Sequence, residues 1–175
     1  TFDFDAYVSA ALFDGSGQAL FALGDGTVRF ETGESVEAHD GAVLGAALHP
    51  TGQGVLTGGD DGRLVWSRPS GAEEIAKVPG RWIEAVAASA ETGMIAYAAG
   101  RELHVRDLAD PAFSRVFVHE KSIADVAFDP KGRLERDEDP LGGFTGLDRD
   151  NGGASYTITK STAKRRVTTI LTEKL

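Results

Sequence analysis

The stretch from His39 to Trp66 contains side chains that can exchange protons. It holds His39, Thr57, Asp60, Asp61 and Trp66. A histidine, a threonine and an aspartate can together serve acid/base or nucleophilic chemistry. The same side chains can instead form a buried hydrogen-bond network that only holds strands in place. The elements that position these residues decide between the two interpretations.

Other reactive groups are sparse in this chain. The absence of Cys excludes disulfides, thiolate metal sites and a cysteine nucleophile. No two of the four histidines have the close spacing of a zinc motif; they are His39, His49, His104 and His119. We therefore predict no metal site, no cofactor and no catalytic residue.

Two motifs near the C-terminal end resemble binding motifs but do not meet their requirements. Residues 148–152 resemble the opening of a calcium loop, but Thr159 stands at the twelfth position, where such a loop needs a glutamate. The basic run Lys164-Arg165-Arg166 is too short for a nucleic-acid patch in an acidic protein. We interpret the first motif as a polar loop and the second as a solvated strand end or an ion-pairing segment.

The net charge of −9 is concentrated in the first three quarters of the chain. Residues 1–134 carry 20 acidic and 11 basic side chains, whereas residues 135–175 carry 7 of each. An acidic surface disfavours binding to nucleic acid or to an anionic membrane. The chain contains no apolar run of membrane-spanning length, and its start lacks the basic region and apolar core of a signal peptide. We expect a cytoplasmic protein that binds neither.

The elements around the reactive stretch follow an internal repeat. Four stretches align, and they start at Val8, Val43, Ile83 and Ile123. Each has an apolar residue five positions on, followed by a turn with glycine. The spacing of about 40 residues, with short apolar strands between turns, is typical of four-stranded β-propeller blades.

Local signals agree with strands. The pairs Asp14-Gly15, Asp25-Gly26 and Asp61-Gly62 suit tight hairpins, because glycine accepts positive φ. Alanines recur on the first strand of each unit, so we expect that strand to run where backbones crowd together. The best helix candidate, Gly71–Lys77, is too short to alter an all-β prediction.

Three pieces of the second unit resemble a WD40 repeat: residues 39–43, the turn His49-Pro50-Thr51-Gly52, and residues 57–62 leading to Trp66. The order of the pieces along residues 1–134 is similar to that in a group of small bacterial WD40 proteins. The resemblance implies WD40-type propeller blades, with three full units, a partial fourth, and a ring that is incomplete within this chain.

The resemblance also implies roles for the reactive residues. In WD40 repeats a histidine, a serine or threonine, an aspartate and a tryptophan form a hydrogen-bonded chain that locks a blade. Those roles fall on His39, Thr57, either Asp60 or Asp61, and Trp66. The usual interval from aspartate to tryptophan is six residues, which matches Asp60, yet Asp61 belongs to the Asp-Gly turn. Both aspartates remain open.

WD40 propellers are typically noncatalytic docking platforms, so we expect a protein-binding scaffold and not an enzyme. Arginine and tryptophan are favoured at interface hot spots, and Arg81-Trp82 lies in the loop that enters the third unit. We expect Asp40, Arg81, Trp82 and Lys121 to contact the partner. A propeller hydrolase is a less favoured alternative, because no carboxylate or histidine recurs in all repeats.

The repeat is interrupted after residue 134. Residues 135–153 are predicted to be an acidic, Gly-rich linker or loop, and residues 154–175 a basic, Thr-rich, strand-like tail. Three full units do not readily close a ring, since propellers typically have 4–8 blades. The tail could complete a fourth blade, two chains could close one ring, or further sequence could be absent.

We favour the last of these explanations, because proteins of the group that the chain resembles are longer. The chain could also be a structural subunit whose tail docks on a neighbour.

Overall fold

The computed structural model describes residues 2–128, 134–137, 155–162 and 165–172, with side chains over 2–128. Every regular element in these ranges is a β-strand, as the all-β prediction requires. No helix in the described ranges is long and apolar enough to cross a membrane.

Twelve of the strands form three antiparallel four-stranded sheets, which we call blades 1 to 3. Blade 1 contains β1 (Val8–Phe13), β2 (Ala19–Leu23), β3 (Thr27–Phe30) and β4 (Ser35–Glu37). Blade 2 contains β5 (Val43–Leu48), β6 (Val55–Gly59), β7 (Arg63–Arg68) and β8 (Gly71–Lys77). Blade 3 contains β9 (Ala85–Ala88), β10 (Met94–Ala99), β11 (Glu102–Asp107) and β12 (Ser114–Val118).

The fourth unit is represented by β13 (Asp125–Phe128) and β14 (Leu134–Asp137), an antiparallel pair that we call blade 4. β14 extends into the segment predicted to be a linker, which begins at residue 135. In the predicted tail, β15 (Ser155–Thr162) and β16 (Arg165–Thr172) pair with each other as a hairpin. The polar loop predicted at residues 148–152 lies outside the described residues.

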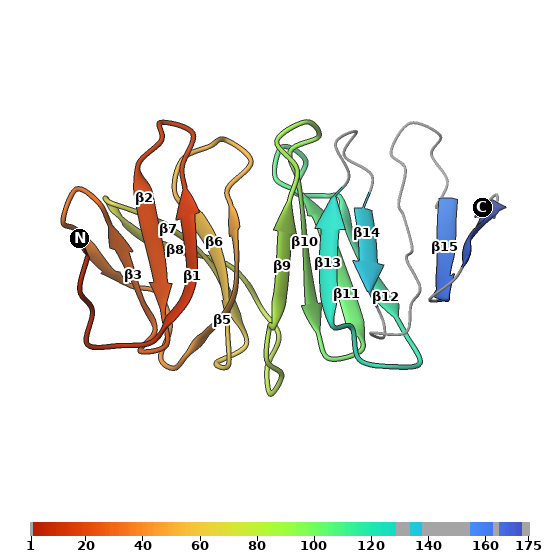
Figure 1. Ribbon diagram of the computed structural model, residues 1–175, viewed down its shortest axis with the longest axis horizontal. Helices are drawn as coiled ribbons and strands as arrows, with labels where there is room; N and C mark the ends of the chain where they lie inside the picture. Colours follow the sequence, from red (N-terminus) through yellow and green to blue (C-terminus); the bar gives the residue numbers. More distant parts are fainter. Residues whose placement is uncertain (1, 129–133, 138–154, 163–164, 173–175) are drawn as a thin grey trace.

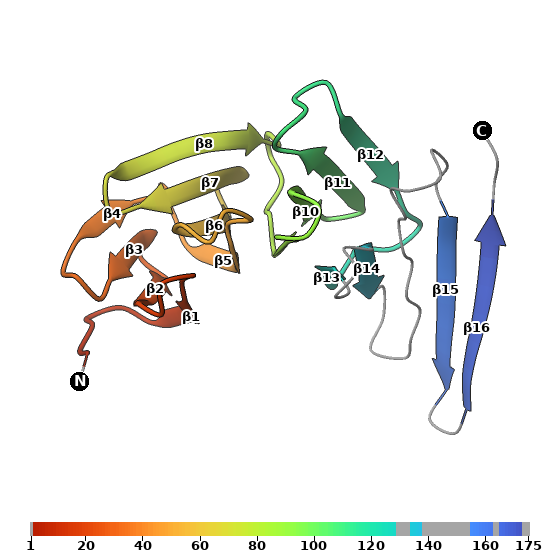
Figure 2. The same cartoon turned by 90° about the horizontal axis from the view of Figure 1, so that it is seen from above.

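The blades follow one another along an arc (Figures 1 and 2). In each full blade the strands are joined in sequence order, so that neighbours along the chain are neighbours in the sheet. The first strands β1, β5, β9 and β13 lie next to one another along the inner side of the arc. Among the described residues the arc does not close into a ring. The predicted all-β architecture of four-stranded blades, with a ring that is incomplete among the described residues, is confirmed.

The first strands approach one another closely, as their alanines predict. A Cβ atom on Gly45 of β5 would lie 2.6 Å from the carbonyl oxygen of Glu84, at the entry to β9. That distance is shorter than any tolerable van der Waals contact. The backbone of blade 2 can therefore reach blade 3 at this point only because residue 45 lacks a side chain.

Glycines with positive φ close two of the three predicted Asp-Gly hairpins. Gly26 has φ of 88° and Gly62 has φ of 75°. In the β1–β2 turn the positive φ falls on Gly17 instead of Gly15. The reason is local: the Asp14 carboxylate accepts the backbone N–H groups of the residues two and four positions on, which carries the turn further along the chain.

Apolar side chains fill the spaces between successive blades. Leu20 and Val28 of blade 1 pack with Val55 and Val65 of blade 2 in one cluster. Equivalent clusters lie between blades 2 and 3 and between blades 3 and 4. Because blades 2 and 3 each have a neighbouring blade on both sides, β6 and β10 are buried along their whole length.

The helix candidate Gly71–Lys77 is wrong, since these residues form β8. They pair with β7 from Arg63 to Arg68. Tertiary pairing overrides a weak local helix preference here, because β7 offers the backbone of a seven-residue segment a partner along its length.

Candidate functional site

His39 is held in the connection between β4 and β5. The backbone N–H groups of Ala38 and His39 both donate to the carbonyl of Gly26, at 3.0 and 3.1 Å. Gly26 lies in the β2–β3 turn of blade 1, and its positive φ brings that carbonyl into the path of the chain. The imidazole is thereby fixed at the boundary between blades 1 and 2.

The imidazole joins two other predicted residues. His39 Nε2 lies 2.9 Å from Thr57 Oγ1, and His39 Nδ1 lies 3.0 Å from Asp61 Oδ1. Both ring nitrogens of His39 therefore have a hydrogen-bonding partner, and the Thr57 hydroxyl also donates to the Val65 carbonyl at 3.4 Å. We call His39, Thr57 and Asp61 the polar network.

Asp61 is the anionic end of the network. Partial burial opposes ionisation of this carboxyl group, but hydrogen bonds from the Arg63 amide, the His39 ring and the Asp40 amide together lower its pKa. The two amide bonds measure 3.0 and 3.1 Å. Asp61 therefore carries its charge at neutral pH and ties the β6–β7 turn to the β4–β5 connection.

The order hydroxyl, imidazole, carboxylate is the one found in nucleophilic triads, so access decides its chemistry. Thr57 is 0% exposed and His39 is 7% exposed. A nucleophile must reach a substrate atom, and Thr57 has no exposed surface in the described structure. The arrangement instead supplies hydrogen bonds to polar groups that would otherwise be buried without partners.

The other two predicted members stand outside the polar network. The backbone N–H of Asp60 donates to the Ala42 carbonyl, but no described hydrogen bond joins the Asp60 side chain to His39. Trp66 pairs with Leu56 on β6, whereas its neighbour Val65 pairs with Thr57. Since adjacent strand residues point to opposite faces, the Trp66 ring lies on the face opposite to Thr57. The structure thus places the Trp66 side chain apart from the polar network.

Trp66 belongs to a second cluster, which the sequence analysis missed. Its ring stacks on His49 at 3.8 Å between centroids, and Arg68 lies 3.8 Å from the ring centroid. Its Nε1–H donates to the carbonyl of Gln53 at 2.8 Å. Burial, followed by the positive charge of Arg68, lowers the pKa of His49. The five-residue interval from Asp61 to Trp66 was the signal that could have revealed this change of face.

The residues predicted to bind a partner lie in equivalent loops. Asp40 follows β4, Arg81 and Trp82 follow β8, and Lys121 follows β12. Each loop joins the last strand of one blade to the first strand of the next, so all of them lie at the same end of the sheets, the lower edge in Figure 1. All four residues are exposed. We call this end the loop face.

Trp82 is 59% exposed, although its loop is fixed on both sides. Before it, the Val78 amide donates to the Gly62 carbonyl at 2.8 Å, and the Arg81 guanidinium lies 3.3 Å from the Glu102 carboxylate. After it, the Ile83 amide donates to the Gly59 carbonyl at 3.0 Å. An exposed indole on a fixed loop loses little conformational entropy on binding.

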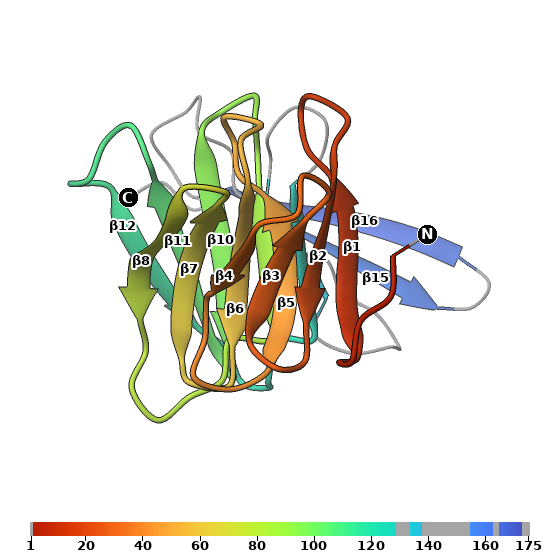
Figure 3. The ribbon, with the colours of Figure 1, turned by 90° about the vertical axis from the view of Figure 1, so that its left-hand side faces the viewer.

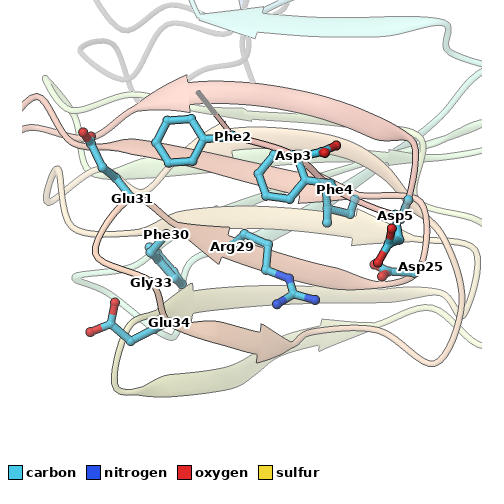
Figure 4. Close-up of a pocket in the computed structure, with 12 residues that line it drawn as sticks. Phe2, Asp3, Phe4, Asp5, Asp25, Arg29, Phe30, Glu31, Gly33 and Glu34 are labelled. Carbon is cyan, nitrogen blue, oxygen red and sulfur yellow. The ribbon is translucent and has the colours of Figure 1, made fainter.

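A cavity of about 330 Å³ lies on blade 1, beneath the segment before β1 (Figure 4). Arg29 extends into it, and the Nε of this side chain is buried without a partner among the described residues. Asp25 lies at one end, where the Thr27 hydroxyl lowers its pKa despite some opposing burial. The cavity contains none of the polar network, so the two features are separate.

Comparison with known proteins adds one match. The family model described as "WD domain, G-beta repeat" matches residues 31–66, a range that extends from before β4 to Trp66 on β7. It includes the whole polar network. No curated protein matches the chain.

Proposed function

The chain carries a WD40 repeat at residues 31–66, and from that premise we propose that it is a noncatalytic scaffold that binds a protein partner through the loop face. WD40 repeats generally mediate protein–protein interaction and are generally noncatalytic. The burial of Thr57 and His39 supports a structural role for the one set of residues whose types suit catalysis.

The observation that carries this proposal is the exposure of Trp82 on a fixed loop. Tryptophan and arginine are enriched among the residues that dominate binding energy, and they work best when they are already in the bound geometry. Trp82 is the anchor in this proposal. Asp40 and Lys121, on the loops to either side, supply charged contacts around it.

The partner surface would have an apolar pocket for the indole, with positive charge around it. Residues 1–134 carry nine more acidic than basic side chains, so a basic surface approaches them faster and an acidic one is repelled. Such steering weakens as salt concentration rises.

Affinity capture with the purified chain tests the proposal. Trp82→Ala is compared with Val116→Ala, a change at a residue of β12 that is 50% exposed and lies on a strand instead of the loop face. We expect the Val116→Ala chain to retain the wild-type partner and the Trp82→Ala chain to lose it. Retention of the same partner by the Trp82→Ala chain, with an unchanged thermal midpoint, would rule out this surface.

A further inference from the structure

Blade 1 has an apolar face that no other blade covers. Val8, Ala11 and Phe13 of β1 lie directly opposite Leu23, Phe21 and Ala19 of β2, so all six side chains belong to one face. Val8 is 37% exposed and Phe13 is 68% exposed. We call Val8, Ala11 and Phe13 the open face. Large apolar side chains gathered in this way mark an interaction site.

The same positions are covered wherever a blade precedes. The residues equivalent to Val8 in blades 2, 3 and 4 are Val43, Ile83 and Ile123, which are 2%, 0% and 2% exposed. The residues equivalent to Phe13 are Leu48, Ala88 and Phe128, and each packs into the cluster that joins its blade to the one before. The internal repeat therefore indicates that the open face fits against another blade.

The segment before β1 follows the same path as the segment that enters the first strand of blade 2. The Gly24 amide donates to the Tyr7 carbonyl at 2.7 Å, and the equivalent bond in the next repeat joins the Asp60 amide to the Ala42 carbonyl at 3.2 Å. Phe2 and Phe4 lie 4.8 and 4.9 Å from the Phe21 ring. They cover Phe21 on β2, whereas Val8 and Phe13 of β1 stay exposed. The N-terminal segment runs beside β1 in Figure 3.

The opposite end of the molecule has complementary features. Blade 4 and the β15–β16 hairpin lie at the other end of the long axis from blade 1 (Figure 1). The cavity beside the open face is lined by five acidic side chains and one basic side chain; the acidic ones are Asp3, Asp5, Asp25, Glu31 and Glu34. Residues 155–172 contain four basic side chains and no acidic one. Opposite charges of this kind favour and orient association.

We propose that the open face binds a second copy of this chain, which presents its blade 4 and its basic hairpin; the opposite charges of the two ends favour this occupant over a blade from further sequence. The contact is head to tail, because the two surfaces differ and lie at opposite ends of each copy. Made twice between two copies, such a contact closes a ring and leaves neither open face exposed. This surface is distinct from the loop face, and neither binding event requires the other.

The mass of the purified full chain in solution provides the first test. We expect twice the 18.5 kDa of one chain for the wild type, and the mass of a single chain for Phe13→Asp. Val118→Asp is the matched control, since Val118 is 69% exposed on a strand of blade 3. A wild-type chain that is single at every concentration, or a Phe13→Asp chain that stays paired, would overturn the proposal. So would a Val118→Asp chain that dissociates.

Mixing two defective chains tests the head-to-tail geometry. Arg165→Glu/Arg166→Glu damages the hairpin and leaves the open face intact, whereas Phe13→Asp does the reverse. Each chain alone should be single. Mixed, they retain one sound contact, and we expect a one-to-one complex of two chains. If the mixture stays single, the two surfaces do not bind each other and the proposal fails. Thermal midpoints of both variants check that they are folded.

Discussion

His39 Nδ1 lies 3.0 Å from Asp61 Oδ1, so the aspartate beside the turn glycine completes the polar network. Asp60, one residue earlier, has the six-residue interval to Trp66 that WD40 repeats usually show, but no described hydrogen bond joins its side chain to His39. The network therefore consists of an imidazole, a hydroxyl and one carboxylate that connect three segments of the chain.

The two aspartates should differ in their contribution to stability. Asp61→Asn removes the charge that accepts hydrogen bonds from His39 and two backbone amides, and a lost charge-assisted bond of this kind costs roughly 1.5–3 kcal/mol of unfolding free energy. Asp60→Asn, the matched change next to it, should cost less than about 0.5 kcal/mol. Urea unfolding of both variants measures the difference. Equal losses would mean that the charge of Asp61 adds nothing to the network.

Thr57→Val should weaken the fold while preserving its shape. The change keeps the side-chain volume but leaves His39 Nε2 buried without its hydrogen-bonding partner, which costs roughly 1–3 kcal/mol. Thr32→Val is the control, because the Thr32 hydroxyl bonds to Glu34 at an exposed position. We expect the control to lie within about 0.5 kcal/mol of the wild type. A Thr57→Val chain that melts like its control would show that the hydroxyl is dispensable.

Gly45→Ala should disturb the contact between blades 2 and 3. The new Cβ would lie 2.6 Å from the Glu84 carbonyl oxygen, and overpacking against backbone typically costs about 1–3 kcal/mol. Gly24→Ala provides the comparison, since its Cβ would approach Tyr7 no closer than 3.5 Å. Thermal unfolding should show a lower midpoint for Gly45→Ala alone. If the two variants have the same thermal midpoint, the close approach at Gly45 does not constrain the packing of the two blades.

Stability should fall as the solution becomes mildly acidic. Burial lowers the pKa of His49 below its ordinary value of 6.5, so between these two pKa values the unfolded chain binds more protons than the folded one. The folded state therefore loses stability as pH falls below about 6.5. His104 is half-buried, and this partial burial lowers its pKa in the same direction although Glu102 opposes the shift.

His49→Gln tests this linkage, because it removes one of the two histidines whose pKa is lowered in the fold. Histidine titrates over roughly pH 5 to 7.5, so urea unfolding is measured across this range. The unfolding free energy should decline less steeply with falling pH in the variant than in the wild type. An unchanged slope would mean that His49 does not contribute to the pH dependence.

The sequence by itself determined the repeat, the strands and the order of the blades. Alternating apolar residues and glycine turns are local signals, and four copies of one pattern reinforce each other. The alanines of the first strands also predicted their close approach, which Gly45 makes closest. The match of residues 31–66 to the WD40 family model confirms the resemblance that these patterns indicated.

Tertiary structure alone decided which side chains meet. The choice between Asp60 and Asp61 depends on which carboxylate the turn directs at an imidazole that is far away in sequence. The separation of Trp66 from Thr57 depends on the register of β7 against β6, in which one residue exchanges the two faces of a strand. The exposure of Val8 and Phe13 depends on whether another blade stands before them, and no local pattern encodes that neighbour.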